Sequence, residues 1–399
     1  MSHIVHDDEL KRRLGLGNSY PDRSDAAYIP VNGDAAALQE LLSRHYNSPP
    51  SPIQLETASS RMSEFSFGAV IPMREHGRVI EPVLDVLVNQ IDPRSIVVVN
   101  DSSDDEALNC VREFADVRLI YRDDVLNTLD WKQLFPLLNV KERPVGKGMA
   151  VLAGYLVHYA LRLDGEKHKW IFQNDSEIAE YKRYQCLPHL VAGLLNHPTA
   201  RAAKTAKFGR TNERSMCMRS ALGLLAELPN VQPLVRHRAN EIFERVSSDK
   251  WIQTGEFALR WDVAMARPFA TGYIEESLCS LFCADFFSKQ GKGFTLKVAN
   301  PNPRLDGAND ERKEAIMQQQ VSNFWMAMAF FGKSLADWDL EDIRVLNHGI
   351  MAKNITMSWI PPNDGPCKAE VVRNDRILPS ITQLVDGGFI NTDALMQLI

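Results

Sequence analysis

Residues 67–100 read FGAVIPMREHGRVIEPVLDVLVNQIDPRSIVVVN, and this stretch decides the fold class of the chain. It begins and ends with short runs rich in β-branched residues, 67–72 and 95–100, which predict two buried strands. Between them, residues 79–89 carry apolar side chains at helical spacing, which predicts a helix. A strand, a helix and a second strand in this order are typical of a parallel α/β sheet.

The alternation continues along the chain. We predict a helix over about 105–114, a strand over 117–121, a helix over 147–163 and a strand over 169–173. The sequence therefore predicts a mostly parallel, Rossmann-like sheet flanked by helices, with its ligand at the carboxyl ends of the strands. Residues 122–145 look irregular, and we expect a long loop there that could close over the site as a lid.

Three regions follow from the pattern. Residues 1–64 are polar and proline-punctuated with a short helical pattern at 35–44, and we expect an N-terminal arm. Residues 65–309 are expected to form the catalytic domain, and residues 310–399 a helical C-terminal region. That last region should contain helices at 314–331 and 340–347, a Pro/Gly-rich stretch at 361–366 and a final short helix.

The composition limits the partners. The formal net charge is −6, which disfavours nucleic acid or anionic lipid as a partner of the whole surface without excluding DNA or RNA in a local cleft. The six cysteines form no C-x-x-C pair and no secretory leader precedes them, so we expect reduced thiols and a cytoplasmic protein. No apolar run approaches the ~18 residues that span a bilayer, so no membrane partner is expected.

Polar clusters follow the first two predicted strands. Pro72-Met73-Arg74-Glu75 follows the first, where an acid can accept hydrogen bonds from a ribose or base and an arginine can face a phosphate; simple capping of the strand is the alternative. Asn100-Asp101-Ser102-Ser103-Asp104-Asp105 follows the second. Ser103 or Asp104 can cap the next helix, but capping leaves Asp101 unexplained.

Two further clusters carry charge. Gly146-Lys147-Gly148 precedes a helix, where amides and an ammonium could meet an anion, or where the lysine could simply be solvated. Asp175-Ser176-Glu177 follows the strand at 169–173. Its two carboxylates would repel each other unless a cation lies between them, and Mg²⁺ or Mn²⁺ would fit; a surface loop with two acids is the alternative.

Two glutamates lie in apolar surroundings further along. Glu256 follows Gly255, and Glu276 ends the stretch Gly272-Tyr273-Ile274-Glu275-Glu276. Charges are seldom buried without partners. Each glutamate could belong to a structural salt bridge, or both could hold sugar and acceptor hydroxyls.

Together these clusters resemble one family of retaining GT-A glycosyltransferases, the mannosyl-3-phosphoglycerate and glucosyl-3-phosphoglycerate synthases, over roughly residues 66–320. NDSSDD and DSE resemble the family's nucleotide-binding and D-x-D metal motifs, with Glu177 in place of the second Asp. Ala203-Lys204-Thr205 and the later Gly209-Arg210-x-x-Glu213-Arg214 resemble its A-K-T and G-R-x-x-E-R elements. The stretch GEFALRWDVAMARPFATGYIEE, residues 255–276, is the most specific match.

The resemblance implies a role for each matching residue. Those that would bind the nucleotide sugar are Pro72, Arg74, Glu75, Asn100, Asp101, Ser102, Gly146, Lys147 and Asp175. Those that would bind the acceptor are Lys204, Arg210, Arg214 and Tyr273. The metal would be held by Asp175, Glu177 and Asp306, and the catalytic residues would be Glu256, Glu276 and Lys147.

The chain departs from the family pattern in two places. The family's third metal ligand is a histidine after the last strand, and the matching residues 300–306 read NPNPRLD. Either Asp306, or as second choice Asn302, substitutes for the histidine, or the metal is held more loosely. The segment from Lys204 to Gly209 is shortened, which reshapes the acceptor side.

The resemblance implies transfer of a hexose from a GDP- or UDP-sugar to a small anionic acceptor such as 3-phosphoglycerate, assisted by a divalent metal. Two alternatives stay open: a glycosyltransferase of the same fold that acts on a macromolecule such as a hydroxymethylated DNA base, and a sugar nucleotidyltransferase or non-catalytic nucleotide-sugar-binding protein. A homodimer is compatible with the sequence.

Overall fold

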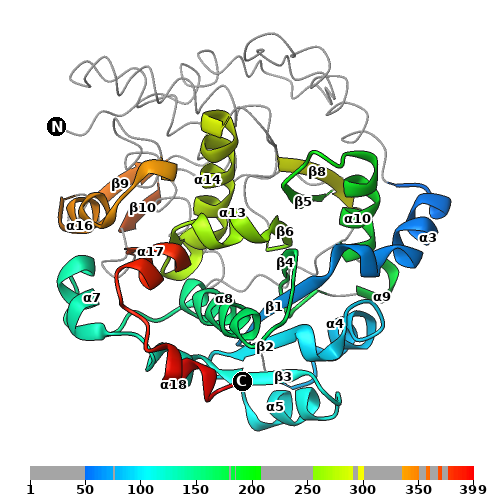
Figure 1. The fold of residues 1–399 in the computed structure, drawn as a ribbon, viewed down its shortest axis with the longest axis horizontal. Helices are drawn as coiled ribbons and strands as arrows, with labels where there is room; N and C mark the ends of the chain where they lie inside the picture. Colours follow the sequence, from blue (N-terminus) through cyan, green and yellow to red (C-terminus); the bar gives the residue numbers. More distant parts are fainter. Residues whose placement is uncertain are drawn as a thin grey trace.

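The computed structural model describes residues 50–74, 77–178, 181–184, 186–207, 255–290, 295–300, 335–349, 356–359, 367–370 and 376–399. These residues form an α/β fold in which a seven-stranded sheet lies between two layers of helices (Figure 1). The predicted fold class is confirmed.

The sheet has the strand order β3-β2-β1-β4-β6-β5-β8. Its strands are β1 (Phe67–Met73), β2 (Ile96–Asn100), β3 (Arg118–Tyr121), β4 (Trp170–Gln173), β5 (Ala202–Lys207), β6 (Phe257–Arg260) and β8 (Thr295–Asn300). All neighbours are parallel except β6, which runs antiparallel to β4 and β5. The central strands β1, β2 and β4 are buried along their whole length, which explains their continuous apolar sequence.

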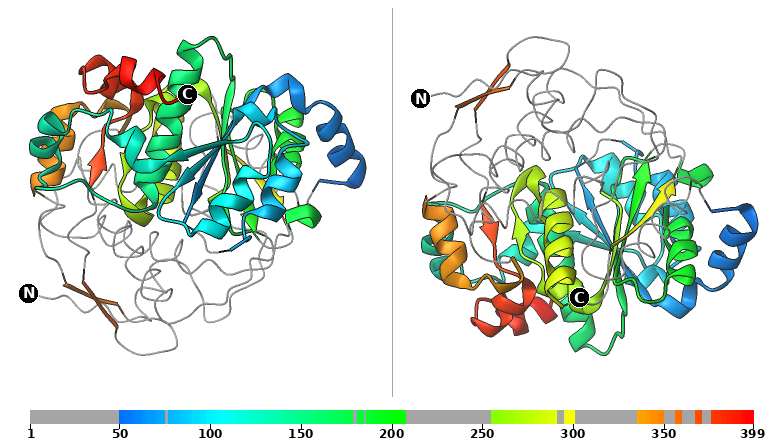
Figure 2. Two further views of the ribbon diagram at one scale, coloured as in Figure 1. Left: turned by 90° about the horizontal axis from the view of Figure 1, so that it is seen from below. Right: turned by 90° about the horizontal axis from the view of Figure 1, so that it is seen from above.

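Each face of the sheet has its own core and its own helices (Figure 2). One face is covered by α6 (Arg122–Leu126), α7 (Trp131–Leu138), α8 (Lys147–Leu163), α13 (Trp261–Ala266), α14 (Glu275–Gln290), α16 (Leu340–Gly349), α17 (Ile381–Asp386) and α18 (Thr392–Met396). The other face is covered by α3 (Pro52–Ser60), α4 (Glu81–Leu87), α5 (Asp105–Arg112), α9 (Tyr181–Tyr184) and α10 (Cys186–Asn196).

Short elements complete the described chain. They are the 3-10 helices η1 (Met62–Phe65), η2 (Pro93–Ser95), η3 (Gly272–Ile274) and η4 (Leu335–Asp337) and the strands β7 (Phe269–Ala270), β9 (Thr356–Trp359), β10 (Cys367–Glu370) and β11 (Ile377–Leu378). The strand β11 pairs with β7, which joins the C-terminal region to the segment before α14.

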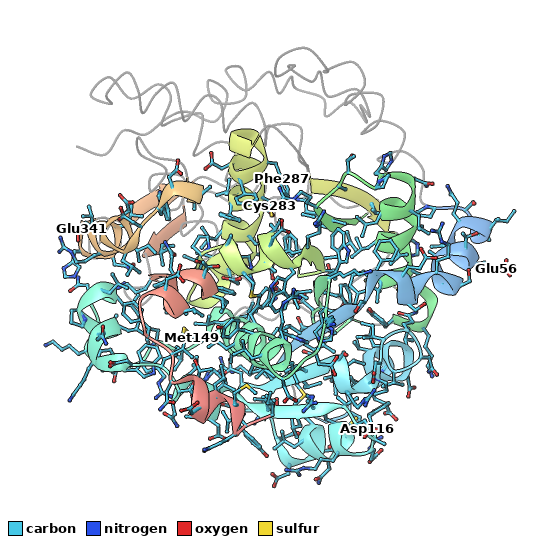
Figure 3. All side chains as sticks on the ribbon, in the orientation of Figure 1. Glu56, Asp116, Met149, Cys283, Phe287 and Glu341 are labelled. Atoms are coloured by element: carbon cyan, nitrogen blue, oxygen red, sulfur yellow. The ribbon has the colours of Figure 1, made fainter. Side chains whose placement is uncertain are left out.

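Helix α8 is the central helix of the fold, and its predicted range of 147–163 is confirmed at both ends. It lies directly on the sheet because Gly154 faces β1: a Cβ there would stand only 2.4 Å from Val70 Cγ1. Figure 3 shows Met149 of α8 inside the molecule, whereas Glu56, Asp116 and Glu341 lie at its margin.

The predicted irregular loop at 122–145 is wrong over most of its length. Residues 122–138 hold α6 and α7, and Leu134 and Leu138 of α7 are fully buried. Trp131 Nε1 donates a hydrogen bond of 2.6 Å to the Leu126 carbonyl, which ties the two helices together. Residues 139–146 join α7 to α8 without a helix or strand, so most of the long lid that we expected consists instead of two helices that pack on the core.

The C-terminal region is partly as predicted. Helix α16 confirms the helix at 340–347, but the chain ends in two short helices, α17 and α18, where one was predicted. Both pack into the core that contains α8 through Ile381, Leu384 and Leu395. The predicted helices at 35–44 and 314–331 lie outside the described residues, and the domain boundaries at 64/65 and 309/310 stay a prediction.

The expectations about membrane-spanning segments and about the cysteines can be compared with the structure. Across the described residues, no helix has both the length and the apolar character needed to cross a membrane. Cys110, Cys186, Cys279 and Cys283 are buried as free thiols.

Candidate active site

The candidate residues gather at one edge of the sheet. The parallel strands β1, β2 and β4 end there, and Phe257 at the start of the antiparallel β6 pairs with Gln173 at the end of β4. Gln173, the last residue of β4, and the three residues that follow it are all buried. This edge is where the carboxyl ends of parallel strands leave a crevice for ligands in α/β proteins.

The centre of the site is an ion-pair cluster. Lys147 Nζ donates hydrogen bonds of 2.6 Å to both Asp175 Oδ1 and Glu276 Oε1. The three side chains come from the start of α8, the end of β4 and the first turn of α14. Lys147 is the most accessible of the three, with 19% of its side chain exposed, against 4% for Asp175 and 8% for Glu276. The ammonium lies between the two carboxylates and offsets their mutual repulsion.

Glycines bring this lysine to the cluster. A Cβ at Gly148 would stand 1.7 Å from the Ala270 carbonyl oxygen, and one at Gly146 would stand 3.0 Å from Gly272 Cα. Gly146 also has a φ of +116°, which side chains seldom tolerate. The Gly-Lys-Gly turn therefore packs against the backbone that leads into α14. Because α8 begins at Lys147, its free amides also make this end of the helix attractive to anions.

Glu256 reaches the same edge from the opposite face of the sheet. It is fully buried, and its Oε2 accepts a hydrogen bond of 3.0 Å from Thr205 Oγ1 in β5. Burial raises the pKa of Tyr181 in α9 well above its ordinary value, and the Glu256 carboxylate adds to this rise. Thr205 follows Ala203 by two residues on β5 and so lies on the sheet face that α9 and α10 cover, whereas Lys147 and Glu276 come from helices on the other face. Lys204, one residue before Thr205, is buried and pairs with Phe257 of β6.

The polar residues after β1 and β2 form a second group. Asp101 is buried, donates its backbone N–H to the Met73 carbonyl at 2.7 Å, and forms an ion pair with Arg122 at the start of α6. Burial raises the pKa of Asp101, while Arg122 and then Arg74 oppose that rise. Asp104 caps α5 by accepting from the Ala107 amide at 2.9 Å, which confirms one of the two predicted capping residues.

The neighbours of Asp101 shape the same turn. Asn100 Oδ1 accepts a hydrogen bond of 2.8 Å from the Ser103 amide, and Ser102 takes a left-handed φ of 70°. Pro72 is buried in β1, and Arg74 after the strand is exposed. These residues surround the carboxyl ends of β1 and β2, the expected place of the nucleoside.

The predicted metal ligands are only partly described. Asp175 is buried and Glu177 is half-buried, and their carboxylate oxygens are donors that suit Mg²⁺ or Mn²⁺. Asp175 Oδ1 already contacts Lys147, so a cation would share this carboxylate with the ammonium. Within the described part of the chain, no group of three His, Cys, Asp or Glu side chains is arranged to hold a metal.

Some predicted site residues lie outside the described part of the chain. These are Glu75, Arg210, Arg214, Asn302, Asp306 and the side chain of Tyr273, whose backbone belongs to η3. Their predicted roles stay predictions.

Three residues that the structure brings into the site were not predicted as site residues from the sequence. Arg122 pairs with Asp101, Gly255 lies against Asp175, and Arg267 pairs with Glu275 beside Glu276. Arg122 had a detectable signal, because it follows the third strand as Asp101 follows the second. Gly255 had a weaker signal: it is a glycine directly before Glu256, the charged residue that precedes β6.

A large groove lies at the opposite edge of the sheet. It has a volume of about 1040 Å³ and is lined by residues that include Phe65, Trp170 and Trp261. Several of its charged side chains already have partners: Arg61 binds Glu64, and Arg162 stacks on Trp261 at 4.6 Å. None of the predicted site residues lines this groove.

The sheet order and the polar residues at the carboxyl ends of its strands define a doubly wound α/β fold of the GT-A type. No family model and no curated protein matches the sequence. Among solved structures, glucosyl-3-phosphoglycerate synthase from Mycobacterium tuberculosis in complex with Mn²⁺, UDP and phosphoglyceric acid matches with 18% identity and a TM-score of 0.50, over 84% of this chain and 96% of that chain. The same enzyme with Mn²⁺ and UDP-glucose matches with identical values.

A second protein of this type is also similar. Mannosyl-3-phosphoglycerate synthase from Rubrobacter xylanophilus matches with 16% identity and a TM-score of 0.49, over 84% of this chain and 93% of that chain. The fold conclusion rests on the two matches with a TM-score of 0.50, and the fold expected from the sequence resemblance is confirmed.

Proposed function

We propose that the protein is a glycosyltransferase that moves a hexose from a nucleotide-sugar donor to a small acceptor. The observation that carries this proposal is the contact of Lys147 with Asp175 and Glu276, at the carboxyl edge of a GT-A type sheet. The Lys147 ammonium and the first amides of α8 can bind the departing diphosphate, and a neighbouring carboxylate can accept hydrogen bonds from the hydroxyls of the sugar. The fold shared with a UDP-glucose-bound synthase supports the same assignment.

The leaving group needs most of the catalytic help. Glycosyl transfer passes through an oxocarbenium-like state while negative charge builds up on the nucleoside diphosphate. Lys147 can bind that charge with its ammonium, and the first amides of α8 can add to it. A divalent metal held by Asp175 and Glu177, with Asp306 as a third ligand, would supply further positive charge to the diphosphate. A preorganised contact of this kind contributes on the order of 3 kcal/mol to transition-state stabilisation.

The nucleoside is proposed to bind over the ends of β1 and β2. Asp101 offers a carboxylate for hydrogen bonds from a base or ribose, and Arg122 holds it in place from α6. Without a partner, a carboxylate as buried as Asp101 would tend to become neutral; the ion pair keeps it an acceptor. UDP and GDP are the nucleotides to be compared, since the base or ribose of either could donate a hydrogen bond to the Asp101 carboxylate.

The sugar and acceptor are proposed to meet between Glu276 and Glu256. Glu276 is held by Lys147 and Glu256 by Thr205, so their carboxylates are fixed before a hydroxyl arrives. The acceptor is proposed to be a small anion such as 3-phosphoglycerate, bound through Lys204, Arg210, Arg214 and Tyr273. Retention of the anomeric configuration is part of this proposal, through front-face attack.

One experiment tests the function and separates its alternatives. The full chain would be screened by thermal unfolding against UDP- and GDP-sugars with Mn²⁺ or Mg²⁺, and active donors would then be incubated with 3-phosphoglycerate or hydroxymethylated DNA. We expect donor-dependent stabilisation and release of nucleoside diphosphate with the small acceptor. Release with DNA alone would favour the macromolecular acceptor, pyrophosphate turnover would favour a nucleotidyltransferase, and binding without any release would favour a binding protein.

A pair of lysine variants supplies the control. Lys147→Met removes the cation from the cluster and should remove transfer, whereas Lys167→Met changes an exposed lysine at the opposite edge of the sheet and should not. Equal activity of the two variants would contradict the assignment of the site.

A further inference from the structure

A second ion pair lies beside the cluster and is entirely buried. Arg267, which follows α13, forms an ion pair with Glu275, the first residue of α14, and both side chains are 0% exposed. Glu275 also accepts a hydrogen bond of 2.8 Å from the Ala270 amide. Burial raises the pKa of Glu275, which Arg267 opposes. The carboxylate therefore has two partners that favour its charged form.

A contribution to stability does not by itself explain why an arginine is buried at position 267. Its guanidinium lies over the rings of Tyr155 and Phe269, at 4.5 and 4.3 Å from their centroids. Within the described structure, its Nε and Nη2 atoms are buried without a hydrogen-bond partner. Buried donors without partners are costly, and an apolar pair of similar volume is commonly at least as stable as a buried ion pair. The pair is thus better explained by what it positions than by the stability that it adds.

What it positions is the neighbouring residue, Glu276. Consecutive side chains of a helix point about 100° apart, so when Glu275 is held on Arg267, the direction of Glu276 is also set. Glu276 then meets Lys147 at 2.6 Å.

The same short segment also supports the lysine. The amide of Ala270 binds Glu275, and the carbonyl of Ala270 lies where a Cβ at Gly148 would stand, directly after Lys147. The segment from Arg267 to Ala270 therefore fixes both partners of the contact between Lys147 and Glu276.

We propose that Arg267 is a positioning residue: through Glu275 it fixes the first turn of α14 so that Glu276 is held against Lys147. The catalytic consequence rests on the proposed glycosyltransferase function, but the positioning itself does not. The residue acts through Glu275 and touches neither donor nor acceptor.

The test replaces the whole pair. Arg267→Met alone leaves Glu275 as a buried charge and would destabilise the fold, so the informative variant is Arg267→Met with Glu275→Leu. We expect this double variant to unfold at or above the temperature of the parent protein, while kcat falls by about 10-fold to 100-fold and the donor KM changes little. If the pair were merely structural, the double variant would keep the parent's activity as well as its stability, and that result would overturn the proposal.

A second measurement does not require activity. The coupling between Lys147 and Glu276 is obtained from a double-mutant cycle of Lys147→Met and Glu276→Gln in thermal unfolding. We expect non-additive melting temperatures in the parent background and additive ones in the Arg267→Met/Glu275→Leu background. If the coupling persists there, the proposal is overturned whether or not the protein transfers sugar. If instead the coupling is lost and the parent shows no transfer with any donor, the proposed function fails and the positioning stands.

A control comes from a distant ion pair. Arg61 and Glu64 form an ion pair at the opposite edge of the sheet. Arg61→Met with Glu64→Gln should leave both kcat and the coupling of Lys147 with Glu276 unchanged. If the coupling between Lys147 and Glu276 were also lost in this control, its loss would reflect a general destabilisation of the fold, and the proposal would be overturned.

Discussion

Gly255 lies directly over the carboxylate of Asp175: a Cβ added at position 255 would stand 2.2 Å from Asp175 Oδ1. Gly255 lies two residues before β6, and Asp175 lies two residues after β4. The first residue of β6 pairs with the last residue of β4, so the segment that leads into β6 lies over Asp175. The same oxygen binds Lys147 at 2.6 Å. The missing side chain at 255 is therefore what allows the carboxylate to keep its contact with the lysine.

Gly255→Ala should impair transfer more than stability. The added methyl group would meet the end of a side chain, so the Asp175 carboxylate can move aside, but it would then lose its alignment with Lys147. We expect turnover to fall on the order of 100-fold, the scale of a misplacement of about 1 Å, as measured by steady-state release of nucleoside diphosphate.

A control separates this effect from glycine replacement in general. Gly165 has a φ of +109°, a Cβ added there would have no atom within 4 Å, and the residue lies at the opposite edge of the sheet. Gly165→Ala should lower the free energy of unfolding by about 1 kcal/mol and leave turnover unchanged. Normal turnover in Gly255→Ala would show that the position of the Asp175 carboxylate is not critical.

Asp175→Ala should slow transfer strongly and leave the fold intact. It removes the predicted metal ligand and one partner of Lys147, while Glu276 still pairs with the ammonium, so no buried charge is left alone. We expect a loss in kcat of about 100-fold to 1000-fold with a melting curve close to that of the parent. Asp164→Ala, which changes an exposed acid at the C-terminal end of α8, is the control, and parental turnover in Asp175→Ala would contradict the metal assignment.

Chelation should stop the reaction reversibly. Without a cation the diphosphate would meet the carboxylates of Asp175 and Glu177 directly, and only Lys147 would offset their repulsion. EDTA is expected to remove transfer, and Mn²⁺ or Mg²⁺ in excess to restore it, in the same assay. Undiminished rates in EDTA would indicate a mechanism in which Lys147 alone screens the leaving group.

The acceptor prediction concerns Arg210. The sequence resemblance places Arg210 on the acceptor side, and an arginine offers a planar fork that matches phosphate or carboxylate. Arg210→Ala should raise the acceptor KM strongly while donor hydrolysis and donor affinity stay nearly unchanged. Loss of donor binding or of the folded state would instead make the arginine part of the scaffold and remove the main support for an anionic acceptor.

Long and strongly patterned elements were predictable from the sequence. Helix α8 was predicted at both ends because a glycine turn precedes it and seventeen residues carry its apolar pattern. The strands β1 and β2 were predicted because both faces are buried and their apolar runs are continuous. Helices α6 and α7 were missed because they are only five and eight residues long, and α7 contains Pro136, a residue that normally argues against a helix.

The site was predictable as a set of residues but not as a set of contacts. Lys147, Asp175 and Glu276 were each chosen from its own motif, yet the two acids are 28 and 129 positions from the lysine in sequence. Their meeting depends on the packing of α8 and α14 over the edge of the sheet, which a one-dimensional pattern does not contain. The roles of Gly255 and Arg267 depend on the same packing and were missed for the same reason. A cytoplasmic location and a homodimer stay predictions.

A buried histidine in α8, His158, is expected to make the stability of the protein depend on pH. His158 is fully buried, its Nε2 lies 2.9 Å from the Ala69 carbonyl oxygen, and its ring packs edge-on against His168 at 5.2 Å. Burial, with a smaller contribution from His168, lowers the pKa of His158 to about 3. In the unfolded chain the pKa should be about 6.5, so the unfolded state takes up the proton first.

The sign and size of the effect follow from this difference. Because the unfolded state binds more protons between about pH 6.5 and pH 3, stability falls as the pH is lowered through that window, by about 2 kcal/mol at pH 5 relative to pH 8. His158→Gln keeps an N–H that can donate to Ala69 but does not titrate, and it should remove that share of the pH dependence. Urea unfolding of both proteins at pH 8 and pH 5 measures the difference, and because His168 is present in both, its own contribution cancels. Equal losses of stability in the two proteins would mean that His158 is not the group that titrates.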